Sequence, residues 1–170
     1  MSVAFFYLLK ENDFMKSSPY ITANGMAHLN DELEKIWIRR RDVVKALSAA
    51  AAEGDRSENA EYIYRKKELR GLDRRIRYLQ KRMPDLRVVS EQPADQSKVF
   101  FAAWVLLEND QQEKVEYRIV GPDEIDHKKE YISLDSPLAQ ALLGKHVDDD
   151  VTIHVQEGTK KYFIEAIRYD

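Results

Sequence analysis

Two stretches of the chain carry apolar residues at alternating intervals of three and four, and this spacing constrains the fold more than any other feature. The first seam spans residues 26–50 and the second spans residues 62–83. Each seam is apolar except at one position, Arg40 in the first and Arg65 in the second. A stripe this narrow stabilises a helix only when a partner covers it, as in a coiled coil. We therefore expect two long helices, each with a partner.

The two seams are mirror images about a point near residue 56. Leu33 and Leu79, for example, lie at equal distances from that point. A chain that folds back there stacks such pairs in successive layers, so the sequence predicts an antiparallel two-helix coiled coil within one chain. The same symmetry places Arg39 level with Asp73, where we expect an ion pair. About thirty residues per arm give a rod on the order of 45 Å long.

The residues after the second seam change to the pattern of strands. One helix is expected there, from Ser136 to Leu143, because Ser136 suits the N-cap position and Pro137 suits the first helical position. The segments expected as strands are rich in β-branched and aromatic residues. They are residues 99–107, 115–120, 151–155 and 162–169.

The distribution of charge divides the chain in the same way. The formal net charge is −3, yet residues 16–83 carry 16 Lys and Arg against 10 Asp and Glu, whereas residues 84–170 carry 10 against 18. A basic and an acidic half suggest two domains with different partners. We expect an α+β protein with an N-terminal extension (1–15), a coiled-coil hairpin domain (16–84) and a small mixed β-sheet domain with one helix (85–170).

Signatures of self-contained enzymes are absent from the sequence. It contains no P-loop, dinucleotide fingerprint, G-x-S-x-G elbow or H-E-x-x-H motif. It contains no Cys, which excludes disulfides, thiolate metal sites and Cys nucleophiles, and its four His residues lack metal-ligand spacing. No apolar run reaches the roughly 18 residues of a membrane span.

Several charges gather at the expected turn between the helices, in the stretch GDRSENAEY. Asp55 and Glu58 are three residues apart there, and this spacing has two interpretations. In a capping box, Asp55 caps the second helix and Glu58 reaches back to the N–H of the cap. Alternatively, both carboxylates complete a Mg²⁺ site in another protein, because Mg²⁺ typically takes one or two protein carboxylates and further ligands from phosphates or a partner.

A row of basic side chains follows one side of the second helix. The row is either a solvated face, relieved by acids such as Glu34 and Asp42, or a track for a polynucleotide backbone. In the second case its phosphate contacts set position but not sequence. The members of the row are Arg65, Lys66, Lys67, Arg70, Arg74, Arg77 and Lys81.

These motifs resemble those of a known family. GDRSENAEY followed by RKKELRGLDRRIRYLQKRM resembles the tip and second helix of the bacterial Gre transcript-cleavage factors, and DRSEN with DRRIRYL resembles their GreB branch. KVFFAAWVLLEND, YRIVGPDEI and YISLDSPLAQALLGK resemble the second domain of the same family. The likeness spans about residues 20–169.

The resemblance implies a transcription elongation factor that inserts its coiled-coil tip into the secondary channel of RNA polymerase. It implies that Asp55 and Glu58 help to hold a Mg²⁺ at the active site of the polymerase, which then cleaves backtracked nascent RNA. The factor itself would be no enzyme and would bind no cofactor stably alone. The basic row would guide the extruded RNA.

The same resemblance implies an FKBP-like fold for the sheet domain, which would dock on a coiled coil at the rim of the channel. The loop at Asp135, Ser136 and Pro137 would take part in that docking. We also expect a cytoplasmic monomer without membrane contacts.

Two other functions remain open. One is a regulator that binds the same channel without supporting cleavage, although acids at both tip positions argue against it. The other is a coiled-coil adaptor whose hairpin is only a spacer, which gives no reason for acids at the tip and bases along one arm.

Overall fold

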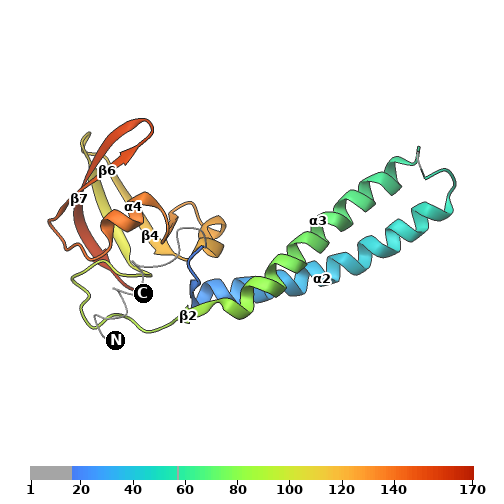
Figure 1. The fold of residues 1–170 in the computed structure, drawn as a ribbon, viewed down its shortest axis with the longest axis horizontal. Coiled ribbons are helices and arrows are strands. Elements are labelled where there is room, and N and C mark those ends of the chain that lie inside the picture. The colour runs from blue at the N-terminus through green and yellow to red at the C-terminus, as the bar shows by residue number, and fades with distance from the viewer. Residues whose placement is uncertain (1–16, 57) are drawn as a thin grey trace. The chain divides into compact units, whose positions relative to one another are not determined.

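The structure is a computed structural model that describes residues 17–56 and 58–170. These residues form two compact units (Figure 1). One unit is Asn24–Leu86, and the other combines the described residues before and after it. The segment 17–23, which the sequence groups with the hairpin, thus clusters with the sheet. Within the described residues, no helix combines the length and the apolar character that a membrane crossing requires.

The first unit is a hairpin of two long helices, α2 (Ala23–Ala52) and α3 (Ala60–Arg82), which lie side by side and antiparallel (Figure 1). Every seam position is buried or half-buried, whereas most positions between them are exposed. The predicted two-helix hairpin is therefore confirmed, with its apolar seam as the buried side. The seam residues with the least exposure are Leu29, Val43, Ala50, Ile76 and Leu79.

The predicted ion pair between Arg39 and Asp73 is wrong by one residue. Asp73 instead accepts from Arg40, with 2.7 Å between Nε and Oδ1, and Arg39 pairs with Glu68 at 2.6 Å. Arg40 is the polar member of the first seam, so its side chain faces the second helix. Arg39 lies next to the seam and reaches a carboxylate on the flank of α3.

The second unit is built on a mixed five-stranded sheet with the order β5-β4-β3-β7-β6. Only β4 and β5 pair in parallel, and the other neighbours are antiparallel. A second, two-stranded parallel sheet joins β1 and β2. The strands are β1 (Tyr20–Thr22), β2 (Arg87–Val89), β3 (Trp104–Asn109), β4 (Lys114–Val120), β5 (Tyr131–Ser133), β6 (Asp150–Val155) and β7 (Gly158–Arg168).

Three short helices complete the described chain. The 3-10 helix η2 (Met83–Asp85) follows α3, and η3 (Pro122–His127) follows β4. Helix α4 (Pro137–Leu142) begins as expected, because the hydroxyl of Ser136 accepts from the N–H of Ala139 at 3.2 Å. The fold class is therefore α+β, as the sequence predicts.

The first strand of the sheet begins five residues later than predicted, at Trp104. Ala102 has a φ of 70°, outside the β region, and its N–H donates to the carbonyl of Ile119. The backbone therefore turns between Phe100 and Ala103 before it enters the sheet. The apolar residues from Val99 to Ala103 are buried or half-buried, but they do not form a strand.

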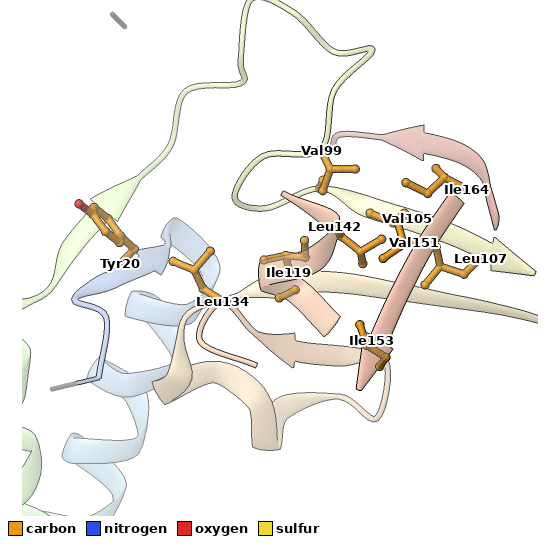
Figure 2. Close-up of a cluster of buried hydrophobic side chains, with 12 residues drawn as sticks. Tyr20, Val99, Val105, Leu107, Ile119, Leu134, Leu142, Val151, Ile153 and Ile164 are labelled. Carbon is orange, nitrogen blue, oxygen red and sulfur yellow. The ribbon is translucent and has the colours of Figure 1, made fainter. Parts of the chain in front are cut away.

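One apolar cluster lies between α4 and the sheet (Figure 2). In Figure 2, Leu142 from α4 points toward Ile119, Val105 and Val151 from three strands. These side chains are at most 3% exposed, so their burial supplies much of the stability of this unit.

The buried carboxylate of Glu124 connects β1 to the rest of its unit through hydrogen bonds. Glu124 is 1% exposed and accepts from the N–H of Thr22 at 3.0 Å, from the hydroxyl of Thr22 and from the N–H of Gly121 at 2.8 Å. A Cβ on Gly121 would lie 2.0 Å from the carbonyl oxygen of Tyr20, so only glycine permits this close approach. Thr22 directly precedes α2, and its hydroxyl donates to Glu124.

Candidate functional site at the hairpin tip

The loop between α2 and α3 holds the two acids singled out in the sequence. Helix α2 ends at Ala52, and Gly54 has a φ of 134°, a conformation that a residue with a side chain rarely adopts. Asp55 and Glu58 are both exposed. The loop therefore presents two carboxylates to solvent at the end of a two-helix arm.

The N-cap of α3 is Asn59, and the capping box predicted for Asp55 and Glu58 is therefore wrong. The Oδ1 of Asn59 accepts from the N–H of Tyr62 at 3.0 Å, and the helix begins at Ala60. Asp55 thus lies four residues before the cap, and Glu58 immediately precedes it. The D-x-x-E pattern suggested a start that lies too early in the chain.

Asn59 also contacts the other helix. Its Nδ2 donates to the carbonyl oxygen of Ala50 at 3.0 Å. Sequence reasoning missed this residue, although Asn is among the preferred N-cap residues and Ala60 and Glu61 follow it as good helix formers. Nothing in the sequence indicates the bond to Ala50.

One aromatic ring near the tip, that of Tyr62, lies close to two cations. Arg56 lies 5.9 Å and Lys66 lies 5.7 Å from the centre of the Tyr62 ring. These distances are within the range of cation–π attraction. Arg56 comes from the loop and Lys66 from α3, so Tyr62 connects the loop to the helix.

The basic row contains one residue held in ion pairs, Arg65, and several exposed residues without an ion pair in the described chain, here called the open basic residues. Arg65 is half-buried and pairs with Glu61 at 2.7 Å and with Glu68 at 3.1 Å. These hydrogen bonds raise the pKa of Arg65 above its ordinary value. Its position in the seam and its two carboxylate partners set it apart from the rest of the row.

The other members of the row are exposed on α3. Arg77 donates weakly to the backbone carbonyl of Asp73 at 3.5 Å. Among the residues that the structure describes, the remaining members of the row form no ion pair. They are Lys66, Lys67, Arg70, Arg74 and Lys81.

The loop expected to dock on a partner connects β5 to α4. Asp135 accepts from the N–H of Ser18 at 2.9 Å and also from its hydroxyl. Ser136 caps α4, and Pro137 is exposed at its first turn. This loop and the tip belong to different units.

The described residues of the tip supply only part of a metal site. Carboxylate oxygens are ligands that suit Mg²⁺. Across residues 17–56 and 58–170, however, no group of three or more His, Asp or Glu side chains lies close enough together to hold a metal ion. Within these described residues, a cation at the tip would therefore lack a complete set of protein ligands.

Comparison with known proteins identifies the family. The family model for the N-terminal part of transcription elongation factors matches residues 19–88, and the model for the C-terminal part of GreA and GreB matches residues 93–169. The chain belongs to the GreA/GreB family of transcription elongation factors. The predicted resemblance is thus confirmed.

Curated relatives agree with the GreB branch of the GreA/GreB family. Transcription elongation factor GreB of Yersinia pestis is 53% identical over 156 residues, which are 91% of each chain. GreB of Pseudomonas aeruginosa is 52% identical over 153 residues, or 89% of this chain and 91% of that protein. Among solved structures, GreA factor homolog 1 of Thermus thermophilus matches with a TM-score of 0.41 and 23% identity, covering 88% of this chain and 97% of its own.

Proposed function

We propose that this chain is an accessory factor of bacterial RNA polymerase that stimulates the cleavage of backtracked nascent RNA. In this proposal the hairpin enters the secondary channel, and Asp55 and Glu58 reach the active site of the polymerase. The polymerase supplies the catalytic machinery, so the factor itself is no enzyme. Membership in the GreA/GreB family supports the proposal, because its relatives are named transcription elongation factors.

One observation carries the proposal: two exposed carboxylates sit on the loop of a hairpin whose second helix is capped by another residue. Asn59 occupies the N-cap position, so the helix start does not depend on Asp55 or Glu58. Both carboxylates are exposed and lie on one short loop. Exposed carboxylates are oxygen ligands that suit a divalent cation, so this arrangement suits delivery to a metal centre better than a spacer role.

The side chains of the tip would act as oxygen ligands that complete a site shared with the polymerase. Mg²⁺ bound there would lower the pKa of a water molecule and stabilise the charge that develops on the phosphate. Asp55 and Glu58 would hold the ion and orient its water. Two carboxylates, with no group of three or more candidate ligands among the described residues, match the shared site that we propose.

The open basic residues on α3 would then contact the extruded RNA. Arg70, Arg74 and Lys81 are exposed and share one side of the helix. Contacts from such a row to phosphates are independent of base sequence, which suits a factor that must act on any transcript. Arg65 contributes less in this proposal, because Glu61 and Glu68 hold its guanidinium.

The loop of Asp135, Ser136 and Pro137 would dock on the polymerase at the rim of the channel. Its backbone is well fixed, since Ser18 donates to Asp135 and Ser136 caps α4. A rigid loop loses little conformational entropy on binding. We further propose that the factor acts as a monomer and that the sheet unit is FKBP-like.

The proposal is tested by replacing Asp55 and Glu58 singly by Ala in the full chain. Each variant should lose cleavage of stalled backtracked complexes while binding the polymerase as tightly as the wild type. Glu53→Ala is a matched control, because Glu53 is also exposed and lies beside the same loop. Equal loss of cleavage in the control, or undiminished cleavage in both test variants, would contradict the assigned role.

A further inference from the structure

We propose that Asn59 is a positioning residue for the tip acids: its carboxamide ties the two helices together and holds the backbone beside Glu58. The inference rests on the proposed function of Asp55 and Glu58. It goes beyond that function because it assigns a role to a residue that contributes no metal ligand.

The tie consists of two hydrogen bonds made by opposite atoms of one side chain. The Oδ1 accepts from the N–H of Tyr62, and the Nδ2 donates to the carbonyl oxygen of Ala50, both at 3.0 Å. The first bond lies within α3 and the second crosses to α2. The start of one helix is therefore joined to the end of the other by a single residue.

The acceptor in α2, the carbonyl of Ala50, lacks the hydrogen bond that it would accept in the middle of a helix. The last carbonyls of a helix lack the usual donor four residues on, and Gly54 leaves the helical path. Ala50 therefore accepts from the N–H of Glu53 at 3.3 Å and, with its second lone pair, from Asn59. Ala50 is only 4% exposed, so solvent has little access to replace a lost bond.

The position of Asn59 in the chain explains why the tie matters for the acids. Asn59 directly follows Glu58, and its own backbone is extended, with φ −82° and ψ 102°. Fixing Asn59 against both helices limits the positions that the neighbouring Glu58 can take. The carboxylates would otherwise have to be ordered when the metal binds, and that ordering opposes binding.

The chemistry of the side chain is specific to this task. Asn59 caps α3 with its Oδ1 and reaches Ala50 with a second polar atom, its Nδ2. Ser is about as good an N-cap as Asn, but its one hydroxyl lies close to the backbone, so a Ser that caps α3 has no second polar atom to reach Ala50. An Asn59→Ser variant should therefore keep the start of α3 and lose the bond to α2.

The test measures RNA cleavage by the polymerase with the full-length Asn59→Ser variant at several Mg²⁺ concentrations. Asn30→Ser is the matched control, because Asn30 also donates from its carboxamide to a backbone carbonyl, that of Met26, at 3.0 Å within α2. Helix content and affinity for the polymerase are measured on the same samples. The double variant Asp55→Ala, Glu58→Ala is included as a third arm.

We expect Asn59→Ser to slow cleavage by about tenfold or more at low Mg²⁺ and to require more Mg²⁺ for half-maximal rate, because small misplacements of catalytic groups are costly. Helix content and polymerase affinity should match those of the wild type and of Asn30→Ser. Wild-type cleavage by Asn59→Ser would overturn the inference. So would a loss that merely follows lost affinity or helix content. If the double variant also cleaved normally, the proposed function itself would fail.

Discussion

Arg40 and Asp73 meet across the hairpin, with 2.7 Å between Nε and Oδ1, at the one polar layer of the first seam. About a third of each side chain is exposed, at 33% and 37%. The guanidinium also lies 5.7 Å from the centre of the Trp37 ring. A charge in an otherwise apolar seam is tolerated here because the opposite helix supplies a carboxylate at the same level.

This pair should contribute modestly to the stability of the hairpin. We expect a coupling energy of about 0.5–1 kcal/mol between Arg40 and Asp73, since the pair is partly exposed. A double-mutant cycle with Arg40→Ala and Asp73→Ala, followed by urea unfolding of all four proteins, measures it. Additive effects of the two substitutions would show that the contact stabilises nothing.

Glu68 should make the stability of the hairpin depend on pH in the acid range. Partial burial raises the pKa of Glu68, but hydrogen bonds from Arg39 and Arg65 outweigh this effect and leave the pKa below its ordinary value of 4.5. Ionised Glu68 therefore contributes fully to the free energy of unfolding above pH 4.5. This contribution is lost as the pH falls through the lower pKa that Glu68 has in the folded state.

Urea unfolding of the wild type and of Glu68→Gln at successive pH values checks this prediction. Between about pH 5 and pH 3 the wild type should lose stability more steeply than the variant. Glu34→Gln serves as the control, because Glu34 forms no ion pair within the described chain. Parallel curves for the wild type and Glu68→Gln would rule out the predicted linkage.

Glu124 should be the most sensitive polar residue of the sheet unit. Glu124→Gln keeps the shape of the side chain but replaces one carboxylate oxygen by an NH2 group. That donor would face the three donors that Glu124 now accepts from, which are the N–H and hydroxyl of Thr22 and the N–H of Gly121. The unsatisfied groups should cost about 1–3 kcal/mol in the free energy of unfolding. Thermal unfolding compares this variant with Glu130→Gln, whose residue is exposed. Similar melting temperatures for the two variants would contradict the prediction.

The open basic residues should matter for RNA rather than for folding. Charge reversal at Arg70 and Arg74 should weaken crosslinking to long backtracked RNA and reduce its dependence on salt. Arg41→Glu with Lys45→Glu is a matched control, because these exposed residues have the same spacing on the other arm. If only the control lost crosslinking, or neither pair did, the row would be a solvated face.

The hairpin could be predicted closely because its seam is a long, regular signal. A narrow stripe repeated over many turns leaves few other folds, and a chain that reverses on itself fixes the order of the layers. The sequence could not distinguish Arg39 from Arg40 as the partner of Asp73. That choice depends on which side chain the packed helix turns toward the seam, and one residue rotates the direction by about 100°.

The sheet and the tip were harder to predict, for local reasons. β1, β2 and β5 have three residues each, too few to show a period. At the tip, Asp55 and Glu58 match a capping box by spacing, whereas the helix begins after Asn59. Local spacing cannot show that Asn59 also bonds to Ala50, because that contact exists only once the helices are packed.

The central claim is that Asp55 and Glu58 complete a Mg²⁺ site with the polymerase, and cleavage of a defined backtracked complex over a range of Mg²⁺ concentrations tests it most directly. With the wild-type factor, cleavage should accelerate and need less Mg²⁺ than with polymerase alone. The Asp55→Ala, Glu58→Ala double variant should bind the polymerase yet leave rate and Mg²⁺ dependence at the level without factor. Wild-type acceleration by that double variant would contradict the account.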